Sequence, residues 1–422
     1  MKPTDAPTPP TDSSPDEPTR PSRSQPLDEA KAVEDFRRIC PRPPTDDEIE
    51  RYLEIQRFWH NYYNPLTESD LVQVAGGLLI ENPADTETRA RPWLWPGYIK
   101  GGDLTLLVGD SGHGKSTLMT EIGRLLVTWP KPWPWPASQI TPAADSVIYL
   151  SREEDRLTEF APRVKAMAGH EADIALERML RIRKVAGEGR SRDLELPGDI
   201  PRLKVMIQET RALGLFIDPL NSYFRSEADL FKEKHVRQVL EPLLDLGHQT
   251  GAAILPAVHL GKGGEGKNAL DKILNSVAYK AVQRAILGVS ILPEDRDKPD
   301  DEKRRIFGGL LSNIGPLNPS LIFTIDRTGV IHWQGPTDRS VAAAIEGRIE
   351  KEDTKVTQGR DAIIRILRPG EKLPAAEINK VLTALGINHE SGTATRIRDF
   401  LGLVTVWDPE TKQWVSFLPG VS

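Results

Sequence analysis

The segment GDSGHGKST at residues 109–117 has the residue types and spacing of a loop that holds phosphate groups. It matches the pattern G-x-x-x-x-G-K-[ST] and lies between a predicted strand and a predicted helix; a chance glycine turn is the alternative. Its glycines let backbone N–H groups converge on phosphate oxygens, Lys115 reaches the β and γ phosphates, and Ser116 Oγ ligates Mg²⁺. The sequence therefore predicts a site for ATP and Mg²⁺ formed by Gly109, Asp110, Ser111, Gly112, His113, Gly114, Lys115, Ser116 and Thr117.

Three further polar side chains follow apolar segments that predict strands. Asp218 has the position of a carboxylate that holds Mg²⁺, with a simple turn before Pro219 as the alternative. Glu153 belongs to an acidic cluster in which a carboxylate can orient and deprotonate water, and a solvated helix start is the alternative. His259 is placed to sense a γ-phosphate, although a histidine after a strand is more commonly structural.

A sheet is needed to position these side chains. From about residue 91, short runs rich in Val, Ile and Leu alternate with amphipathic helical patterns, which predicts an α/β domain with a mainly parallel sheet and helices on both faces. The predicted strands are 104–108, 147–150, 215–217, 253–258 and 285–291, with a hairpin-like pair at 321–325 and 330–333. The predicted helices are 115–127, 159–167, 201–213 and 235–249.

Composition suggests how the rest of the chain is organised. Residues 1–27 are rich in proline and are predicted to be disordered, and residues 28–90 are predicted to form a helical segment. The α/β domain is expected over 91–335, and the polar stretch 336–357 is expected to be a linker, in part helical. Residues 358–422 read as three helices followed by a hairpin, which is the order of a winged-helix domain.

Charge and cysteine content narrow the class of protein. The net charge of −6 excludes a globally basic nucleic-acid coat but allows a local basic channel. A single cysteine, Cys40, excludes a disulfide framework and any cysteine-based zinc site. No apolar run predicts a membrane span and no signal peptide is recognised, so we expect a cytoplasmic protein without a membrane partner.

The stretches GDLTLLVGDSGHGKST, VIYLSREED, LGLFIDPLNSYF, AILPAVHLGKGG and NSVAYKAVQRAILGV occur in this order. Together they resemble RecA-like P-loop ATPases, specifically the plasmid RepA-type hexameric replicative helicases, over about residues 91–326. The resemblance implies a RecA-like core in which Glu153 is the catalytic base, Asp218 the Mg²⁺ carboxylate and His259 the γ-phosphate sensor. The family usually has one glutamate before the aspartate, whereas this chain has two, so Glu154 is held in reserve as the base.

The resemblance also implies a hexameric ring in which each site is completed by an arginine from the neighbouring subunit. Arg284 matches the position of that arginine finger, and a surface arginine beside a strand is the alternative. Arg304 and Arg305 are fallbacks in a loop that reads as a solvated insertion. Asn313 matches a polar position of the family, but Ser312 stands where the family often has lysine.

Two regions are candidates for contact with nucleic acid. The glycine-rich segment 261–268 carries Lys262 and Lys267, and six such loops would line a channel around single-stranded DNA. A flexible surface loop without a ligand is the alternative. In the predicted winged helix, Arg396 and Arg398 are placed to lie along duplex DNA, and a protein partner is the alternative.

The expected function is that of a ring-forming ATP-dependent DNA translocase or helicase, in replication of a plasmid, phage or mobile element. The replication context comes from the resemblance alone. Two alternatives stay open. One is a nucleic-acid-dependent ATPase that acts as a loader, recombination or defence factor without unwinding, and the other is an ATP-controlled winged-helix DNA-binding regulator.

Overall fold

The computed structural model describes most of residues 91–417. Gaps in this description are residues 129–132, 135–143, 187–189, 225–232, 262–267, 274–278, 280–281, 316, 351–352, 368–371, 402 and 410. Before residue 91 only scattered positions and the short paired strands β1 (Val72–Gln73) and β2 (Leu79–Ile80) are described. The predictions for residues 1–27, and most of those for 28–90, therefore lie outside the described residues.

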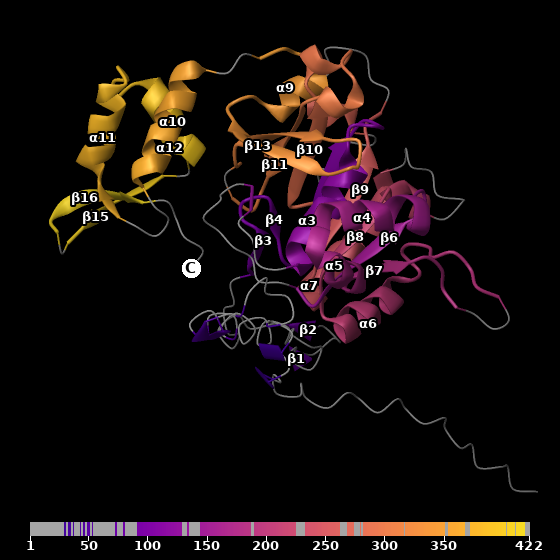
Figure 1. Cartoon of the computed structure of the whole chain (residues 1–422). Coiled ribbons are helices and arrows are strands. Elements are labelled where there is room, and N and C mark those ends of the chain that lie inside the picture. Colours follow the sequence, from indigo (N-terminus) through magenta and orange to yellow (C-terminus); the bar gives the residue numbers. More distant parts are fainter. Residues whose placement is uncertain are drawn as a thin grey trace, which may run out of the picture.

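The described part of the chain is built on one large sheet. Its strands are β5 (Thr105–Gly109), β6 (Ser146–Ser151), β7 (Met179–Ile182), β8 (Ala212–Asp218), β9 (Ala253–His259), β10 (Ala285–Ile291), β11 (Arg305–Ser312), β12 (Ser320–Ile325) and β13 (Ile331–Thr337). They lie in the order β13-β12-β11-β10-β5-β9-β8-β6-β7 (Figure 1). From β10 to β7 along this order all pairs are parallel, whereas β11, β12 and β13 pair antiparallel. The predicted α/β class with a mainly parallel sheet is confirmed.

Helices cover both faces of the sheet, because alternate residues of its strands are apolar on both sides. On one face lie α3 (Lys115–Val127), α4 (Ala161–Ala168), α5 (Ala172–Arg178) and the hairpin of β3 (Trp93–Trp95) and β4 (Ile99–Lys100). On the other lie α6 (Ile200–Thr210), α7 (Glu233–Thr250) and α9 (Val341–Glu346). Short helical turns connect these elements: η3 (Arg156–Phe160), η4 (Gly169–Glu171), η5 (Leu220–Tyr223), η6 (Ala269–Lys272), η7 (Pro293–Asp295) and η8 (Asp300–Glu302).

Two strands of the large sheet were not among the predictions. Strand β11 lies in the sheet between β10 and β12, and its sequence RIFGGLLS contains two glycines, which lower the strand propensity of a segment. Strand β7 forms the edge next to β6 and has four residues, too few for a clear alternation.

Helix α9 lies inside the predicted linker 336–357. Val341, Ala344 and Ile345 are buried in the same apolar cluster as the strands, so the first half of this segment is part of the packed domain rather than a solvated connection. Ser340 caps the helix by accepting from the N–H groups of Ala342 and Ala343.

Residues 353–417, here called the C-terminal module, have an apolar cluster of their own. The elements are α10 (Thr354–Ile366), β14 (Leu373–Pro374), α11 (Ala375–Ala384), α12 (Gly392–Leu401), β15 (Val404–Asp408) and β16 (Gln413–Phe417). The three predicted helices and the hairpin are present. The additional strand β14 pairs with β16, giving a small sheet in the order β14-β16-β15.

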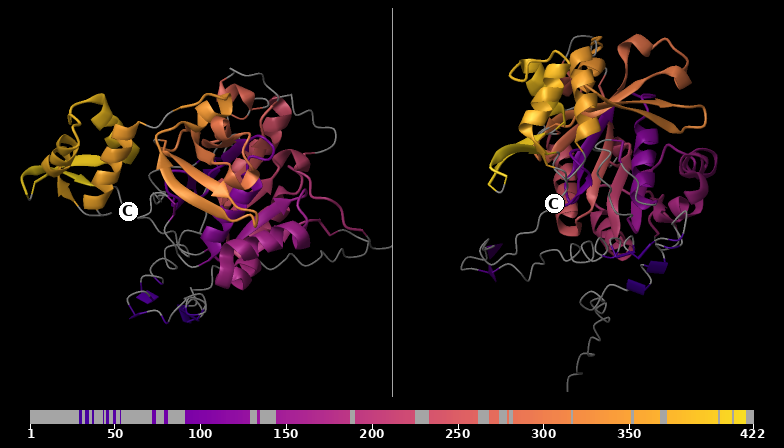
Figure 2. Two further views of the ribbon diagram at one scale, coloured as in Figure 1. Left: turned by 45° about the horizontal axis from the view of Figure 1, so that its top comes forward. Right: turned by 60° about the vertical axis from the view of Figure 1, so that its left-hand side comes forward.

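The C-terminal module lies beside the antiparallel end of the large sheet (Figure 2). Arg360 of α10 donates to the carbonyl O of Pro336 in β13 at 2.6 Å. Arg396 of α12 donates to Asp338 at 3.1 Å and to Asp353 at 2.9 Å. The backbone N–H of Asp353 also donates to Asp338. The Asp338 carboxylate therefore accepts hydrogen bonds both from the start of the C-terminal module and from its helix α12.

Candidate nucleotide site

The carboxyl ends of four neighbouring parallel strands, β5, β9, β8 and β6, meet at one edge of the sheet. Gly109 at the end of β5 is level with His259 at the end of β9. Asp218 at the end of β8 is level with Ser151 at the end of β6. Residues from four separate stretches of sequence therefore line a single edge, which is where parallel sheets usually bind ligands.

The loop between β5 and α3 fits tightly against the sheet. Gly114 is the N-cap of α3 with φ of +95°, and a Cβ there would lie 2.9 Å from Ile325 Cδ1. A Cβ on Gly109 would lie 2.5 Å from the carbonyl O of Val289. Only glycine is accommodated at these two positions, whereas residues 110–112 are exposed on the outer side of the loop.

Lys115 is a buried cation that forms no ion pair with a described carboxylate. Its ammonium donates to the carbonyl O of Gly109 at 2.8 Å and of Asp110 at 2.9 Å. Burial lowers the pKa of Lys115. The N-terminus of α3 adds positive potential at the same place. These observations fit a site for the phosphates of a nucleotide.

His259 lies beside Lys115, with Nδ1 at 3.2 Å from the ammonium nitrogen. Because an ammonium can only donate, Nδ1 accepts and the imidazole is neutral with its proton on Nε2. Burial and the neighbouring Lys115 both lower the pKa of His259, which favours that neutral form. The Nε2–H group is then free to donate to an oxygen of a bound phosphate.

Ser116 and Asp218 form the predicted metal pair. The Ser116 hydroxyl donates to the Asp218 carboxylate, and burial raises the pKa of Asp218 above its usual value. No group of three or more potential protein ligands occurs among the described residues. One carboxylate and one hydroxyl suit Mg²⁺, which commonly takes its remaining ligands from phosphate oxygens and water.

The structure distinguishes the two adjacent glutamates. Glu154 accepts from Arg163 at 2.6 Å and its side chain is largely buried in that ion pair. Glu153 is exposed, and its charge acts on Lys115, Asp218 and His259 together. The position of Glu153 favours it over Glu154 as the base that receives a proton from water. The role of Arg163 was not predicted, since nothing in its own sequence context indicates a partner.

Arg284 lies at the opposite edge of the sheet. It directly precedes β10, and its N–H donates to the carbonyl O of Leu104 at the start of β5. Five strand residues separate that level from Gly109, which corresponds to roughly 16 Å. The exposed Arg284 therefore lies far from the phosphate loop of its own chain.

The fallback arginines are engaged within their own chain. Arg305 is 1% exposed and donates to Asp300, with its side chain against Gly114 under the phosphate loop. Arg304 forms ion pairs with Glu294 and Asp295. The prediction of a solvated loop holds for residues 296–300 and 302, which are exposed, whereas Asp295 and Arg305 at its two ends are buried.

Strand β11 ends at Ser312 near Arg284, and Asn313 follows it. The N–H of Asn313 donates to the carbonyl O of Arg284 at 2.8 Å, and Ser312 Oγ accepts from the N–H of Ile314. Both residues therefore belong to the edge that carries Arg284.

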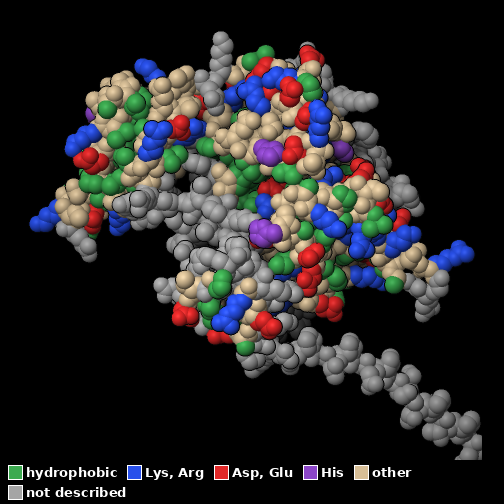
Figure 3. Space-filling model, in the orientation of Figure 1, with side chains coloured by type: hydrophobic (Ala, Val, Ile, Leu, Met, Phe, Trp, Pro, Cys, Tyr) green, Lys and Arg blue, Asp and Glu red, His purple; other side chains and the backbone are tan. Residues whose placement is uncertain are grey.

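Of the four candidate nucleic-acid residues, the structure describes only the two arginines of the C-terminal module. Lys262 and Lys267 lie outside the described residues. Arg396 bridges Asp338 and Asp353, and Arg398 donates to the carbonyl O of His389 and to Asn379. Both guanidinium groups are thus engaged within the chain. On the face seen in Figure 3 basic and acidic side chains are interspersed.

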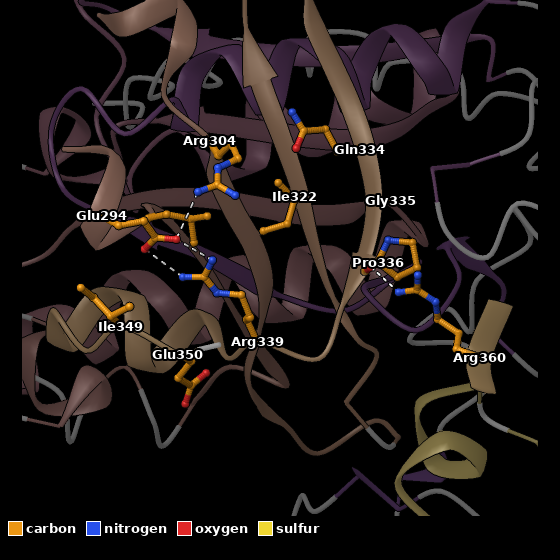
Figure 4. Close-up of a pocket in the computed structure, with 11 residues that line it drawn as sticks. Glu294, Arg304, Ile322, Gln334, Gly335, Pro336, Arg339, Ile349, Glu350 and Arg360 are labelled. Carbon is orange, nitrogen blue, oxygen red and sulfur yellow. Dashed lines mark hydrogen bonds and ion pairs between the residues drawn. The ribbon is translucent and has the colours of Figure 1, made fainter. Parts of the chain in front are cut away.

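A cavity of about 490 Å³ lies on the face of the sheet opposite α3, between the antiparallel strands and α10. Figure 4 shows Arg304 and Arg339 turned toward Glu294 and Arg360 turned toward Pro336. Among its charged side chains, Glu294 forms ion pairs with Arg304 and Arg339, whereas Glu350 and Arg360 form ion pairs with residues outside the lining. The lining residues are Leu292, Glu294, Arg304, Ile322, Gln334, Gly335, Pro336, Arg339, Ile349, Glu350 and Arg360.

None of the helices that the structure describes has the length and apolar character needed to cross a bilayer.

A family model described as an AAA domain matches residues 70–265. The matched region contains Lys115, Glu153, Asp218 and His259 and ends before Arg284. It indicates a P-loop ATPase domain of the AAA-like kind, and hence nucleotide binding and ATPase activity in general. Comparison with curated proteins gives no significant match.

Proposed function

We propose that the chain is a ring-forming ATP-driven DNA translocase or helicase of the RecA-like type, assembled as a homohexamer. One observation carries the proposal: Lys115, Asp218, Glu153 and His259 lie at one edge of the sheet, and Arg284 lies at the other. An arginine so placed cannot complete the site of its own subunit, but it can complete the site of a neighbour. Replication of a plasmid, phage or mobile element is the proposed context, by resemblance.

The proposed reaction is in-line attack of water on the γ-phosphate of ATP. Glu153 accepts the proton from the attacking water as the new P–O bond forms and the bond to the β-phosphate oxygen breaks. Lys115 and the loop N–H groups hold the phosphates, and His259 contacts the γ-phosphate. Ser116 and Asp218 hold Mg²⁺, which neutralises charge on the β and γ phosphates. Arg284 of a neighbouring subunit stabilises the charge that develops in the transition state.

Mixing two inactive variants tests the shared site. Lys115→Ala removes the phosphate contact of one half-site, and Arg284→Ala removes the contribution to the next. Neither variant alone should hydrolyse ATP above background. In an equal mixture, random assembly gives about a quarter of interfaces an intact Lys115 on one side and an intact Arg284 on the other. We therefore expect the mixed protein to regain a measurable part of wild-type ATPase activity.

A mixture that stays inactive, while each variant still assembles with wild-type subunits, would contradict a shared site. Native mass measured with a non-hydrolysable ATP analogue and single-stranded DNA reports the number of subunits. Displacement of a strand from forked DNA separates a helicase from a loader, recombination or defence factor that hydrolyses ATP without unwinding.

The C-terminal module supports a second candidate function, that of an ATP-controlled DNA-binding regulator. Its elements follow the order helix, strand, helix, helix, hairpin, which supports a winged-helix assignment. We propose duplex DNA or a protein as its partner, although Arg396 and Arg398 must leave their present contacts to reach DNA. An ATP-dependent change in duplex affinity, without unwinding of forks, would favour the regulator.

The channel contact proposed for Lys262 and Lys267 follows from the sequence of the loop after β9. Because β9 ends at His259, this loop begins beside the proposed γ-phosphate contact. Such a position would couple the state of the nucleotide to a single strand of DNA in the ring.

A further inference from the structure

Residues 151–155 lead from the end of β6 to η3, and all of them except Glu153 take part in hydrogen bonds that restrain this segment. Ser151 and Glu154 accept at their carbonyl oxygens, Arg152 donates through its guanidinium, and Asp155 accepts from the N–H groups of Leu157 and Thr158. Within the described residues, the side chain of Glu153 makes no hydrogen bond or ion pair that restrains it. The exposed glutamate is thus presented by a tightly held backbone.

Arg181 of β7 provides the central contact. Its Nη2 donates to the carbonyl O of Ser151 at 3.2 Å and to that of Glu154 at 2.9 Å. These two carbonyls bracket Glu153 in the chain. The guanidinium of Arg181 also lies over the ring of Phe160, 4.7 Å from its centroid. This contact restrains the orientation of the planar guanidinium group.

Arg152 provides a second contact from within the segment itself. Its guanidinium donates to the carbonyl O of Ser222 and to that of Leu194, the latter at 2.6 Å, and lies 4.7 Å from the centroid of Tyr223. Ser222 and Tyr223 belong to η5, which follows the metal carboxylate Asp218 by two residues. Arg152 therefore joins the backbone of Glu153 to that of the proposed metal site.

These contacts are poorly explained by stability alone. Nε and Nη1 of Arg181 are buried without a hydrogen-bond partner, as is Nε of Arg152. Burial lowers the pKa of Arg181, which means that its charge is disfavoured where it lies. Unpaired buried donors are costly, and they persist where the geometry they maintain is needed.

We propose that Arg181 and Arg152 are positioning residues that hold the backbone on both sides of Glu153, so that its carboxylate faces the γ-phosphate. The inference rests on the proposed role of Glu153 as catalytic base. Neither arginine touches the nucleotide in this proposal. Arg181 fixes the position of residues 151–154 relative to strand β7. Arg152 fixes their position relative to η5, the turn that follows Asp218.

Steady-state ATPase measurements on the full chain test the proposal. Arg181→Ala should lower kcat by about tenfold or more, while the affinity for a fluorescent ATP analogue changes by less than about twofold. Arg181→Lys, which can donate to one carbonyl at a time, should retain an intermediate kcat. Arg183→Ala is the matched control, because Arg183 is exposed, two residues further on, and carries the same charge.

A double-mutant cycle with Glu153→Gln, measured in single turnovers, separates positioning from a general loss of structure. If Arg181 acts through Glu153, adding Arg181→Ala to Glu153→Gln should lower the rate no further. A further loss as large as that in the wild-type background would overturn the inference, and so would an unchanged kcat in Arg181→Ala. If Glu153→Gln itself keeps wild-type turnover, the assignment of the base fails, which is a distinct result.

Discussion

At the scale of single residues, Glu153 and Glu154 differ in what surrounds them rather than in chemistry. Glu154 is paired with Arg163, whose side chain also lies beside the turn at Gly329. Glu153 is exposed at the strand end, within electrostatic reach of Lys115 and Asp218. The surroundings of Glu154 indicate a structural contact, and those of Glu153 support its proposed role as the base.

Substitution of each glutamate by glutamine tests this division. Glu153→Gln should lower kcat about a hundredfold or more, with nucleotide affinity retained, because a neutral amide cannot accept the proton from water. Glu154→Gln should leave kcat within about threefold and instead lower stability by about 1–3 kcal/mol, since Arg163 loses its charged acceptor. ATPase assays and thermal melting of both variants provide the measurement, and an exchange of these two outcomes would assign the base to Glu154.

The phosphate-loop residues could be predicted from sequence because their spacing is local: a strand, a loop and a helix within about twenty residues. The choice between the two glutamates could not be predicted from spacing. It depends on Arg163, which comes from the following helix α4, and on Arg181, which comes from a strand that sequence patterning did not identify.

At the scale of elements, Asp199 binds together the segment that leads into α6 and the first turn of that helix. Its side chain is 1% exposed and accepts from Arg192 at 2.6 and 2.7 Å, from Arg202 at 2.9 Å and from the N–H of Glu195. Hydrogen bonds from Arg192 lower the pKa of Asp199 to about 2. The folded state therefore favours the ionised carboxylate.

Asp199→Asn should lower the free energy of unfolding by about 2 kcal/mol at pH 7, where the carboxylate is ionised in both states. Because the folded pKa is depressed, this contribution is complete above the ordinary pKa of 3.8 and is lost as the pH falls toward about 2. Urea unfolding at pH 7 and at pH 3.5 should show the difference between wild type and variant narrowing at the lower pH.

Asp193→Asn is the control for this prediction, because Asp193 is exposed in the same segment. Its substitution should leave stability within about 0.5 kcal/mol at both pH values. An Asp199→Asn variant as stable as wild type at pH 7 would show that the arginines contribute nothing through this carboxylate.

Most strands and helices could be predicted because they carry continuous apolar runs or a clear helical period. Strand β11 could not be predicted, because the sequence of the charged loop before it does not indicate which of its charges pair with each other. Asp295 is fully buried there and accepts from Arg304 and Lys298. The helical part expected within 336–357 is present as α9, but its packing into the core could not be predicted, because its apolar face is short and stands between polar residues.

At the scale of the whole molecule, polar contacts of Asp353, Arg360 and Arg396 join the C-terminal module to the sheet domain within the part of the chain that the structure describes. Arg396 donates to Asp338 and Asp353, and its side chain is 55% exposed. Asp338 is 8% exposed, but the arginine remains in water, and ion pairs with an exposed partner typically add only about 0–1 kcal/mol to stability. Their main effect is therefore on where the module lies and not on whether it folds.

Arg396→Ala should leave thermal stability within about 1 kcal/mol and accelerate protease cleavage of the connection between Gly347 and Asp353. Arg398→Ala is the matched control, because both of its acceptors, the His389 carbonyl and Asn379, lie within the module. Time courses of limited proteolysis measure the difference. Equal cleavage rates in the two variants would indicate that Arg396 does not hold the module in place.

The edge on which Arg284 lies could be established only from the register of β10 against β5. The sequence places Arg284 next to a strand, but parallel and antiparallel pairing put that end of the strand at opposite edges. The pairing of Ala285 with Thr105 decides the matter.

The proposed pairing of Arg284 with the phosphate loop of a neighbouring subunit has a consequence for symmetry. A subunit with two unlike half-sites on opposite edges associates head to tail, so a dimer related by a two-fold axis cannot satisfy both half-sites at once. Each added subunit completes one site. An open assembly still has an unpaired phosphate-loop half-site at one end and an unpaired Arg284 at the other. Only closure removes those ends, and an assembly whose rotation per subunit does not close grows instead as an open helix.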